Sequence, residues 1–256
     1  MSKEPDYLAA NRAAWTGANA EYTDGKAHGA WAQEHIDWGT TRTRESDVNV
    51  LPDVAGKDVV ELGCGTGYFG AWLARRGARV VGVDVTPAQL DTARRMEAEF
   101  GLGLTFVEAN AEDTGLPGDS FDLVLSEYGA SIWCDPAKWL PEAARLLHDG
   151  GHLVLLRNST LAVLCMTEEG GESETLQRPQ RGLYRLDWTE PHPETEFQLG
   201  HGELFGLLRK SGFEEEALVE LFAAEDAVRH EYYSMNAEWA KKWPSEEIWR
   251  ARLQRP

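Results

Sequence analysis

The sequence predicts an α/β fold with a doubly wound, mostly parallel sheet and helices on both of its faces. Between Gly56 and Leu156, short apolar segments alternate with segments of helical periodicity. The segments that end at Leu62 and Asp84 carry a carboxylate at or near the end of an apolar strand, where parallel sheets place ligand-binding groups. Repeated strand–helix units with short connections imply one large domain.

The composition restricts the class of protein. The chain has 256 residues, 42% of them hydrophobic, which suits one main domain with additional segments. No apolar run approaches the roughly 18 residues of a membrane span, and the N-terminus lacks the basic start and apolar core of a signal peptide. We therefore expect a cytoplasmic monomer or homodimer without a membrane partner.

Charge and cysteine usage exclude further classes. With 25 basic and 43 acidic side chains, the formal charge is −18, which repels a phosphate backbone, so no nucleic-acid partner is expected. Cys64, Cys134 and Cys165 form no C-x-x-C pair, which argues against a disulfide framework or a thiolate zinc site. No cluster of histidines and carboxylates has metal-site spacing, so no metal is predicted.

Residues 1–50 are predicted to form an N-terminal helical lid or cap. Apolar side chains recur every seven residues from Leu8 to Tyr22, which places them on one helix face. Glycines at 25 and 29 indicate a break, after which a second helix face follows over residues 28–38. This second face consists of His28, Trp31, His35 and Trp38. We interpret it as packing on the domain or closing over a ligand.

Residues 51–222 are predicted to form the main domain, with a polar insertion near 159–198. Thr86-Pro87 and Asp135-Pro136 are start signals for helices, and Gly77 and Gly212 are stop signals. Strands are expected at residues 59–62, 79–84, 104–108, 121–126, 152–156 and 213–222, and helices at 68–76, 87–100, 136–148 and 202–210.

Residues 223–256 are predicted to be an aromatic C-terminal extension that docks on the domain. Within it, Pro244–Glu247 resembles the start of a last helix. A final antiparallel strand is not evident, and residues 225–233 are the candidate for it.

The glycine-rich stretch E-L-G-C-G-T-G at residues 61–67 is the strongest site signal. Residues 65–70 formally match the G-x-G-x-x-G pattern of dinucleotide enzymes. That pattern begins two residues too late after the strand, and Glu61 would repel a pyrophosphate. An ammonium group is the natural partner of Glu61, and S-adenosylmethionine offers one, together with two ribose hydroxyls for Asp84.

Five ordered motifs resemble class I S-adenosylmethionine-dependent methyltransferases, a family with a Rossmann-like, seven-stranded type of sheet. They are E-L-G-C-G-T-G at 61–67, G-V-D at 82–84, N-A-E at 110–112, F-D at 121–122 and L-H-D-G-G at 147–151. The resemblance covers about 100 residues and implies an enzyme that uses S-adenosylmethionine.

In such enzymes, the first strand's acid and glycines contact the methionyl group, the second strand's acid holds the ribose, and the segment after the third strand meets the adenine. The resemblance implies these cofactor-binding residues: Glu61, Gly63, Cys64, Gly65, Asp84, Val85, Gln89, Asn110, Ala111, Glu112, Ser126 and Tyr22. Asn110 departs from the family's usual aspartate, but an amide oxygen can accept the same hydrogen bond.

Methyl transfer requires alignment of the acceptor and, where the acceptor must lose a proton, a base. The candidates for catalysis are His201, His35 and Tyr128, with Glu127 also in reach of the methyl group. The candidate substrate contacts are Trp31, Trp38, Glu127 and Trp133, which suit a flat or apolar acceptor.

We expect metal-independent methyl transfer to a small molecule, with oxygen, nitrogen, carbon or sulfur open as the acceptor atom. The N-P-P-Y type signature of enzymes that methylate nucleobase amines is absent after Leu125. Two alternatives stay open: a non-catalytic, S-adenosylmethionine-binding regulatory protein, and a methyltransferase that acts on tRNA or protein.

Overall fold

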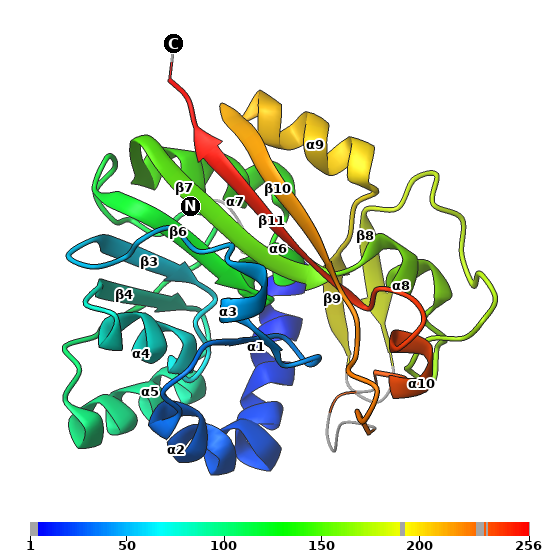
Figure 1. The fold of residues 1–256 in the computed structure, drawn as a ribbon, viewed down its shortest axis with the longest axis horizontal. Helices are drawn as coiled ribbons and strands as arrows, with labels where there is room; N and C mark the ends of the chain where they lie inside the picture. Colours follow the sequence, from blue (N-terminus) through cyan, green and yellow to red (C-terminus); the bar gives the residue numbers. More distant parts are fainter. Residues whose placement is uncertain (1–4, 190–192, 229–232, 234, 256) are drawn as a thin grey trace.

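A central seven-stranded sheet organises the protein, with strand order β10-β11-β7-β6-β3-β4-β5 (Figure 1). The computed structural model describes residues 5–189, 193–228, 233 and 235–255. The strands are β3 (Asp58–Leu62), β4 (Arg79–Asp84), β5 (Thr105–Glu108), β6 (Phe121–Glu127), β7 (Leu147–Asn158), β10 (Phe213–Leu221) and β11 (Glu246–Leu253). Strands β3 to β7 pair in parallel, and β11 pairs antiparallel with both β7 and β10. The predicted fold class is confirmed.

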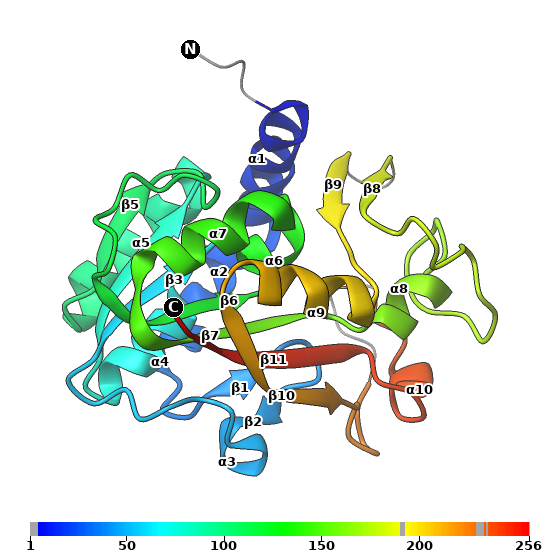
Figure 2. The same ribbon diagram turned by 90° about the horizontal axis from the view of Figure 1, so that it is seen from above.

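Helices cover both faces of this sheet (Figure 2). One face packs against α7 and α9 through Trp139, Leu140 and Leu208. The other face packs against α4 through Phe69 and Leu73. The principal helices are α1 (Asp6–Ala18), α2 (Asp24–Ala32), α4 (Tyr68–Arg75), α5 (Pro87–Phe100), α6 (Gly129–Trp133), α7 (Pro136–Leu146) and α9 (His201–Lys210).

The sequence signals for helix boundaries mark the right positions. Pro87 occupies the first turn of α5, and the Asp135 side chain accepts a hydrogen bond from the Ala137 amide at the start of α7. Gly77 and Gly212 follow α4 and α9 with φ of +89° and +90°, values that favour glycine. Helix α7 ends at Leu146 rather than near residue 148, because β7 begins at Leu147.

The predicted aromatic helix over residues 28–38 is wrong. Helix α2 runs through both glycines, follows a π-helical turn, η1 (Asn19–Thr23), and ends at Ala32. The chain then forms a hairpin of β1 (Asp37–Trp38) and β2 (Thr43–Arg44), followed by the short helix α3 (Glu45–Val48). Burial of Trp38 explains the change, because its ring packs 4.7 Å from that of Phe69 and its indole N–H donates to Glu45 at 2.6 Å.

The C-terminal prediction also needs correction. Residues 246–253 form strand β11 inside the central sheet, so the expected helix start at Pro244 and the domain boundary at 223 are both wrong. Successive residues of a strand face opposite sides, and β11 buries both sides, Ile248 on one and Trp249 on the other. The alternative strand candidate, residues 225–233, lies partly outside the described residues.

The segment 159–198 contains regular structure at both ends. Helix α8 (Thr160–Cys165) follows β7, and β8 (Arg185–Trp188) pairs with β9 (Glu194–Phe197) in a two-stranded sheet. Residues 167–182 form neither helix nor regular strand, as expected from their polarity. A short helix, α10 (Ala237–Ala240), packs against α8 through Trp239.

Nowhere in the described part of the chain is a helix both long and apolar enough to cross a membrane.

The docking of α1 yields a testable prediction. Asn11 is 3% exposed; its side chain accepts from the Thr195 amide at 2.7 Å and donates to the Thr195 carbonyl at 2.9 Å. Asn11→Ala leaves both buried groups without this partner, so we expect a loss of about 2 kcal/mol and a fall of about 4–8 °C in Tm. The exposed variant Ala13→Ser on the same helix serves as the control. Equal thermal transitions for the two variants would contradict the role of Asn11.

Candidate cofactor and acceptor site

The glycine loop lies between the carboxyl ends of β3 and β4. The amides of Gly63 and Cys64 donate to the Val83 carbonyl at 2.8 and 3.0 Å. Gly63 has φ of +77°, and a Cβ there would lie 2.5 Å from the Cα of Gly129, so the loop touches the start of α6. Such close backbone approach explains the glycine and gives the edge its shape.

Asp84 closes the loop from the second strand. Its two carboxylate oxygens accept from the Gly65 amide at 2.9 Å and from the Thr86 amide at 2.8 Å. Each oxygen keeps a further lone pair that can accept from a ligand hydroxyl. Burial raises the pKa of this carboxyl group.

Glu61 lies beneath the loop and is 3% exposed. Its carboxylate accepts from the Gly70 amide at 3.0 Å, at the start of α4. Burial raises its pKa well above the usual range, and the charges of Glu127 and Asp84 raise it further. The negative charges of Glu127 and Asp84 are therefore close enough to disfavour the ionised form of Glu61 at this edge of the sheet.

The segment after β5 is fixed by its own hydrogen bonds and by α1. The Asn110 side chain accepts from the Glu112 amide at 3.0 Å, and Ala111 is buried. The Glu112 carboxylate accepts from the Tyr7 hydroxyl and from the Asp135 amide at 2.9 Å, and it forms an ion pair with Lys138. The Glu112 side chain thus ties α1 and α7 together beside the predicted adenine position.

The N-terminal helices lie directly on the predicted cofactor residues. Arg12 donates to the Val85 carbonyl at 3.2 Å. Gln89, 2% exposed, accepts from the Thr23 hydroxyl at 3.1 Å and donates to the Trp15 carbonyl at 3.2 Å. Tyr22 stacks edge-on to Tyr233 at 5.9 Å, and Figure 1 shows α1 beside the carboxyl ends of β3 and β4.

Two of the predicted cofactor residues, Ser126 and Cys64, have side chains that are buried within the protein. Ser126 is fully buried; its hydroxyl donates to the Leu62 carbonyl at 3.0 Å and accepts from the Ser131 amide at 3.1 Å. These bonds join β6 to β3 and to α6. The Cys64 thiol is also buried, and burial raises its pKa well above the usual range, so it is not a reactive thiolate.

Glu127, the last residue of β6, and Tyr128, which follows it, extend this edge toward β11. The Glu127 carboxylate accepts from the Tyr68 hydroxyl at 2.7 Å and from the Gly39 amide at 3.2 Å. The Tyr128 hydroxyl donates to Glu246, which also accepts from the Thr40 amide at 2.7 Å. The turn of the β1–β2 hairpin therefore covers this part of the edge.

Tyr128 has a strained backbone, with φ of +56° and ψ of −79°. A tyrosine rarely adopts such angles, and strain of this kind gathers at functional sites. Burial raises the pKa of its phenol well above the usual range, as does the nearby charge of Glu246. Tyr128 is therefore a hydrogen-bond donor at neutral pH, which argues against its predicted role as a base.

Both predicted histidines pair with carboxylates other than Glu61, Asp84 and Glu127. His201, at the start of α9, contacts the buried carboxylate of Glu247 at 2.7 Å, and this hydrogen bond raises the pKa of His201. Glu247 faces the opposite side of β11 from Glu246, because side chains alternate along a strand. His35 lies before the β1–β2 hairpin and contacts Asp37 at 3.3 Å.

The three tryptophans predicted as substrate contacts have different surroundings. Trp31 and Trp38 are 0% exposed and belong to the core, so their prediction as substrate contacts is wrong. Trp31 donates to the Thr66 carbonyl at 2.8 Å, which supports the glycine loop from behind. Trp133 is half-buried and lies edge-on to Trp15 at 5.4 Å. The Trp15 indole N–H is buried and has no hydrogen-bond partner within the described residues.

Sequence reasoning missed Tyr68 and Glu246. Tyr68 directly follows the glycine loop, but nothing in the sequence tells which way the first side chain of that helix points. The Pro244–Glu247 pattern predicts a helix start at Glu246, although residues 249–253 alternate between apolar and basic side chains as a strand with one buried face would. That alternation was the available signal.

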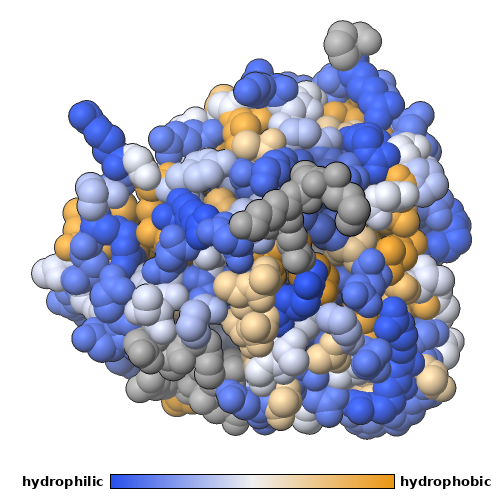
Figure 3. Space-filling model, turned by 180° about the vertical axis from the view of Figure 1, so that it is seen from behind, coloured by the Kyte–Doolittle hydropathy of each residue, from blue (hydrophilic) through white to orange (hydrophobic). Residues whose placement is uncertain are grey.

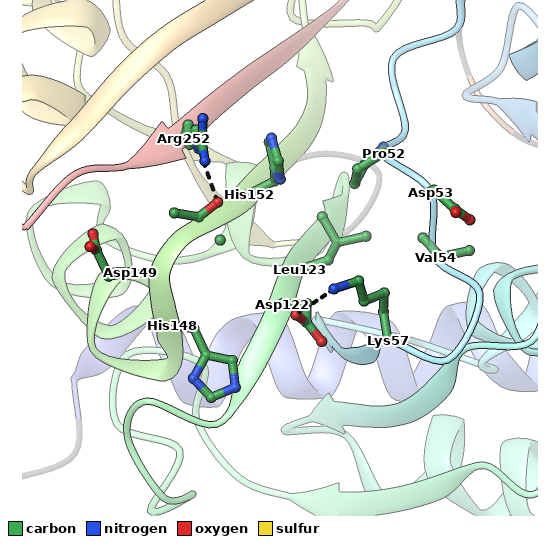
Figure 4. Close-up of a pocket in the computed structure, with 12 residues that line it drawn as sticks. Pro52, Asp53, Val54, Lys57, Asp122, Leu123, His148, Asp149, His152 and Arg252 are labelled. Carbon is green, nitrogen blue, oxygen red and sulfur yellow. Dashed lines mark hydrogen bonds and ion pairs between the residues drawn. The ribbon is translucent and has the colours of Figure 1, made fainter.

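A separate hollow lies at the opposite, amino ends of the parallel strands (Figure 4). Lys57 and Asp122 line it and form an ion pair of 3.1 Å. Arg252 reaches it from the end of β11 and donates to the Gly150 carbonyl at 3.1 Å. Because the glycine loop is at the carboxyl ends, this hollow is remote from the candidate site. In the described part of the chain, no three histidine, cysteine or acidic side chains are grouped to hold a metal.

The charges at the carboxyl edge suit S-adenosylmethionine. Among the described residues, no lysine, arginine or histidine forms an ion pair with Glu61, Asp84 or Glu127. A ligand with a sulfonium and an ammonium group supplies positive charge at this place, and its ribose hydroxyls find acceptors on Asp84. The sheet order and this loop define a Rossmann-like fold of the methyltransferase type.

Comparison with known proteins finds similarity to methyltransferases. Residues 60–155 match the family model described as a methyltransferase domain. A demethylmenaquinone methyltransferase from Thermus thermophilus is 38% identical over 117 residues, 45% of this chain and 53% of that protein. A ubiquinone biosynthesis O-methyltransferase from Cereibacter sphaeroides is 29% identical over 66% of this chain and 65% of its own length.

A solved structure agrees with these relatives. An S-adenosylmethionine-dependent methyltransferase from Mesorhizobium loti superposes with a TM-score of 0.64 at 25% identity, over 81% of this chain and 95% of its own. Over its methyltransferase segment and in its fold, the chain resembles class I S-adenosylmethionine-dependent methyltransferases, which supports S-adenosylmethionine as its cofactor. It spans about half the length of several curated relatives that it matches.

Glu127 makes stability depend on pH in a defined direction. Burial and the charge of Glu246 raise the pKa of Glu127 from 4.5 to about 7. Between these values the folded protein holds a proton that the unfolded chain releases, so the free energy of unfolding falls as pH rises from about 4.5 to about 7. Glu127→Gln is neutral throughout and should reduce this fall by on the order of 1–2 kcal/mol.

Urea unfolding at pH 5 and pH 8 measures this effect, with the exposed variant Glu169→Gln as control. We expect the control to keep the pH dependence of the natural protein. If Glu127→Gln keeps it too, Glu127 is already ionised at pH 5.

Proposed function

We propose that this protein transfers the methyl group of S-adenosylmethionine to a small-molecule acceptor. The observation that carries the proposal is the cover over the carboxyl edge. Helix α1, the η1 turn and the β1–β2 hairpin are hydrogen-bonded to residues of the cofactor and acceptor edge through Arg12, Thr23 and Gly39. Such a cover favours an enclosed small molecule over a folded macromolecule.

Charge and relatives support the same class of acceptor. The formal charge of −18 disfavours nucleic acid. Figure 3 shows a face of the molecule dominated by hydrophilic side chains, with apolar groups scattered across it. Two relatives are named for demethylmenaquinone and for ubiquinone biosynthesis, which supports a flat ring as acceptor. Trp15 and Trp133, beside the edge, suit such a ring.

The protein's own contribution is alignment and exclusion of water. S-adenosylmethionine, when bound, supplies an electrophilic methyl group on a sulfonium. Asp84, Glu61 and the backbone of Gly63 and Gly65 would hold it, with the segment 110–112 beside the adenine. The half-buried residues Glu127 and Tyr128 would orient the acceptor. They directly follow Ser126, whose hydroxyl donates to the Leu62 carbonyl just before the glycine loop.

The test offers methyl-tritiated S-adenosylmethionine with three separate acceptor pools: a low-molecular-weight metabolite extract, bulk tRNA and cell protein. We expect label only in the metabolite pool, with one S-adenosylhomocysteine formed per methyl transferred. Label in tRNA or protein would replace the small-molecule acceptor. Calorimetric binding without label in any pool would favour the non-catalytic regulatory protein. Asp84→Ala serves as the variant without a ribose acceptor.

A further inference from the structure

We propose that Glu127 is the catalytic residue that takes a proton from the acceptor. This inference rests on the proposed function and narrows the acceptor to molecules that have a proton to lose. It selects Glu127 from the groups that the sequence analysis placed in reach of the methyl group. The evidence is the position of its carboxylate, its free lone pairs, the groups that face it and the unsuitability of the other titratable groups nearby.

Glu127 lies where an acceptor would meet the cofactor. It is the last residue of β6, and the preceding residue, Ser126, donates to Leu62 just before the glycine loop. Its two carboxylate oxygens accept one hydrogen bond each, from Tyr68 at 2.7 Å and from the Gly39 amide at 3.2 Å. Since a carboxylate has about four acceptor positions, both oxygens can still accept a proton. The side chain is only half-buried, which leaves it accessible.

The groups that face Glu127 come from four elements. Tyr68 faces it from α4, Glu61 from β3, Glu246 from β11 and the Gly39 amide from the β1–β2 turn. Glu246 is held by the Thr40 amide, the Thr40 hydroxyl at 2.9 Å, the Thr41 amide at 3.0 Å and the Tyr128 hydroxyl. In the described part of the chain, no basic side chain forms an ion pair with Glu127. Burial and the charge of Glu246 raise its pKa to about 7, so that it can accept a proton and release it again near neutral pH.

The other titratable groups suit this role less well. Tyr128 is neutral at physiological pH and donates to Glu246. Glu61 is buried beneath the glycine loop with the Gly70 amide. His201 and His35 are already paired with the carboxylates of Glu247 and Asp37. Glu127 is the carboxylate of this edge that is both accessible to an acceptor and raised to a pKa of about 7.

The proton step is simple to balance. An O–H, N–H, S–H or acidic C–H bond of the acceptor breaks, its electron pair stays on the acceptor atom as the nucleophilic pair, and the proton moves to a carboxylate oxygen of Glu127. This pair would form the new bond to the methyl carbon while the methyl–sulfur bond breaks and its electron pair stays on sulfur. The neutral carboxyl group returns that proton to solvent after the product leaves. The acceptor is therefore a hydroxyl compound, a thiol, a carbon acid or a protonated amine. A thioether or a neutral tertiary amine, which has no such proton, is not expected.

Tyr68 acts as a positioning residue for this group. Its hydroxyl donates to the ionised form of Glu127, and this bond lowers the pKa of the carboxyl group against the effect of burial. Tyr68→Phe removes the donor and keeps the ring. We expect the pKa of Glu127 to rise, so that the acid limb of the pH–rate profile moves to higher pH. A role in packing alone would not move that limb.

The test measures tritium transfer from S-adenosylmethionine to the metabolite extract between pH 5.5 and pH 8.5. We expect the rate of the natural protein to rise through about pH 7. Glu127→Gln should lose on the order of 100-fold or more, Glu127→Asp should recover part of that loss, and Glu169→Gln should change nothing. Each variant is checked for a rise in Tm with S-adenosylhomocysteine, which reports folding and cofactor binding without methyl transfer.

The outcomes separate the inference from the function on which it rests. If Glu127→Gln keeps the rate and the pH profile of the natural protein, the proton role of Glu127 is overturned, but the proposed methyl transfer is not. Loss of the S-adenosylhomocysteine shift in Glu127→Gln overturns it too, because the residue then acts through cofactor binding. No transfer by the natural protein, despite a shift, overturns the proposed function and the proton role with it. As a further measurement, the infrared difference between natural protein and Glu127→Gln, both with S-adenosylhomocysteine, should show a carboxyl band that disappears near pH 7. A carboxylate ionised throughout overturns the inference.

Discussion

Asp84→Ala should abolish the thermal stabilisation that S-adenosylmethionine gives to the protein. At a ligand concentration of 100 times Kd, the natural protein should gain about 2.7 kcal/mol, or about 5–10 °C in Tm. Asp84 accepts from the Gly65 and Thr86 amides and offers the remaining lone pairs to the ribose. Removing the carboxylate takes away the ribose acceptors and leaves the two loop amides without this partner, so the shift should vanish at the same concentration.

A matched control distinguishes the lost contact from a general loss of stability. Asp91 lies on α5, forms an exposed ion pair with Arg94, and touches none of the loop residues. Asp91→Ala should therefore keep the full shift. Differential scanning fluorimetry with and without ligand measures both variants. An unchanged shift in Asp84→Ala would place the ribose elsewhere and contradict the site.

Gly63→Ala should cost the most stability of the substitutions considered. The added Cβ would lie 2.5 Å from the Cα of Gly129 and 2.8 Å from the Ala130 amide nitrogen, and both are backbone atoms that cannot rotate away. The residue also has φ of +77°, which disfavours alanine. We expect a loss of about 3 kcal/mol or more, together with weaker binding of S-adenosylmethionine.

Gly56→Ala is the matched control, because Gly56 has a similar φ of +71° with no heavy atom within 4 Å of the added Cβ. It should cost about 1–2 kcal/mol from the backbone conformation alone. Chemical denaturation of both variants then isolates the close approach of the loop to α6. Equal losses would mean that α6 moves aside freely, and the loop would not define the cofactor edge.

The sequence predicted the central α/β unit because its signals are local. An apolar strand, a glycine loop and a helix start lie within a few residues of one another around Glu61, Gly67 and Asp84. Strands β3 to β6 and β10 and helices α4, α5, α7 and α9 were therefore predicted with small errors at their ends, whereas β7 begins five residues before its predicted start, and α6, α8, β8 and β9 were not predicted. The cofactor edge followed, since parallel strands bring their carboxyl ends together.

The errors arose where distant parts of the chain decide the structure. Trp38 joins the core because the hairpin turn is anchored by Glu246, more than 200 residues later, and no local pattern encodes that contact. The same carboxylate was interpreted as the start of a helix. Glu127 and Tyr68, adjacent in space and 59 positions apart, form the pair on which the proton role rests. Periodicity within a helix or strand cannot reveal such pairs.

The most direct test of the site is a crystal structure of the full chain with S-adenosylhomocysteine. We predict the ribose hydroxyls within hydrogen-bonding distance of the Asp84 carboxylate, and the amino-acid end of the ligand beside the loop of Gly63 and Gly65. We also predict Glu127 facing the ligand's sulfur across the end of β6. A ligand found at the opposite ends of the strands, in the hollow beside Lys57 and Arg252, or with no contact to Asp84, would contradict this account.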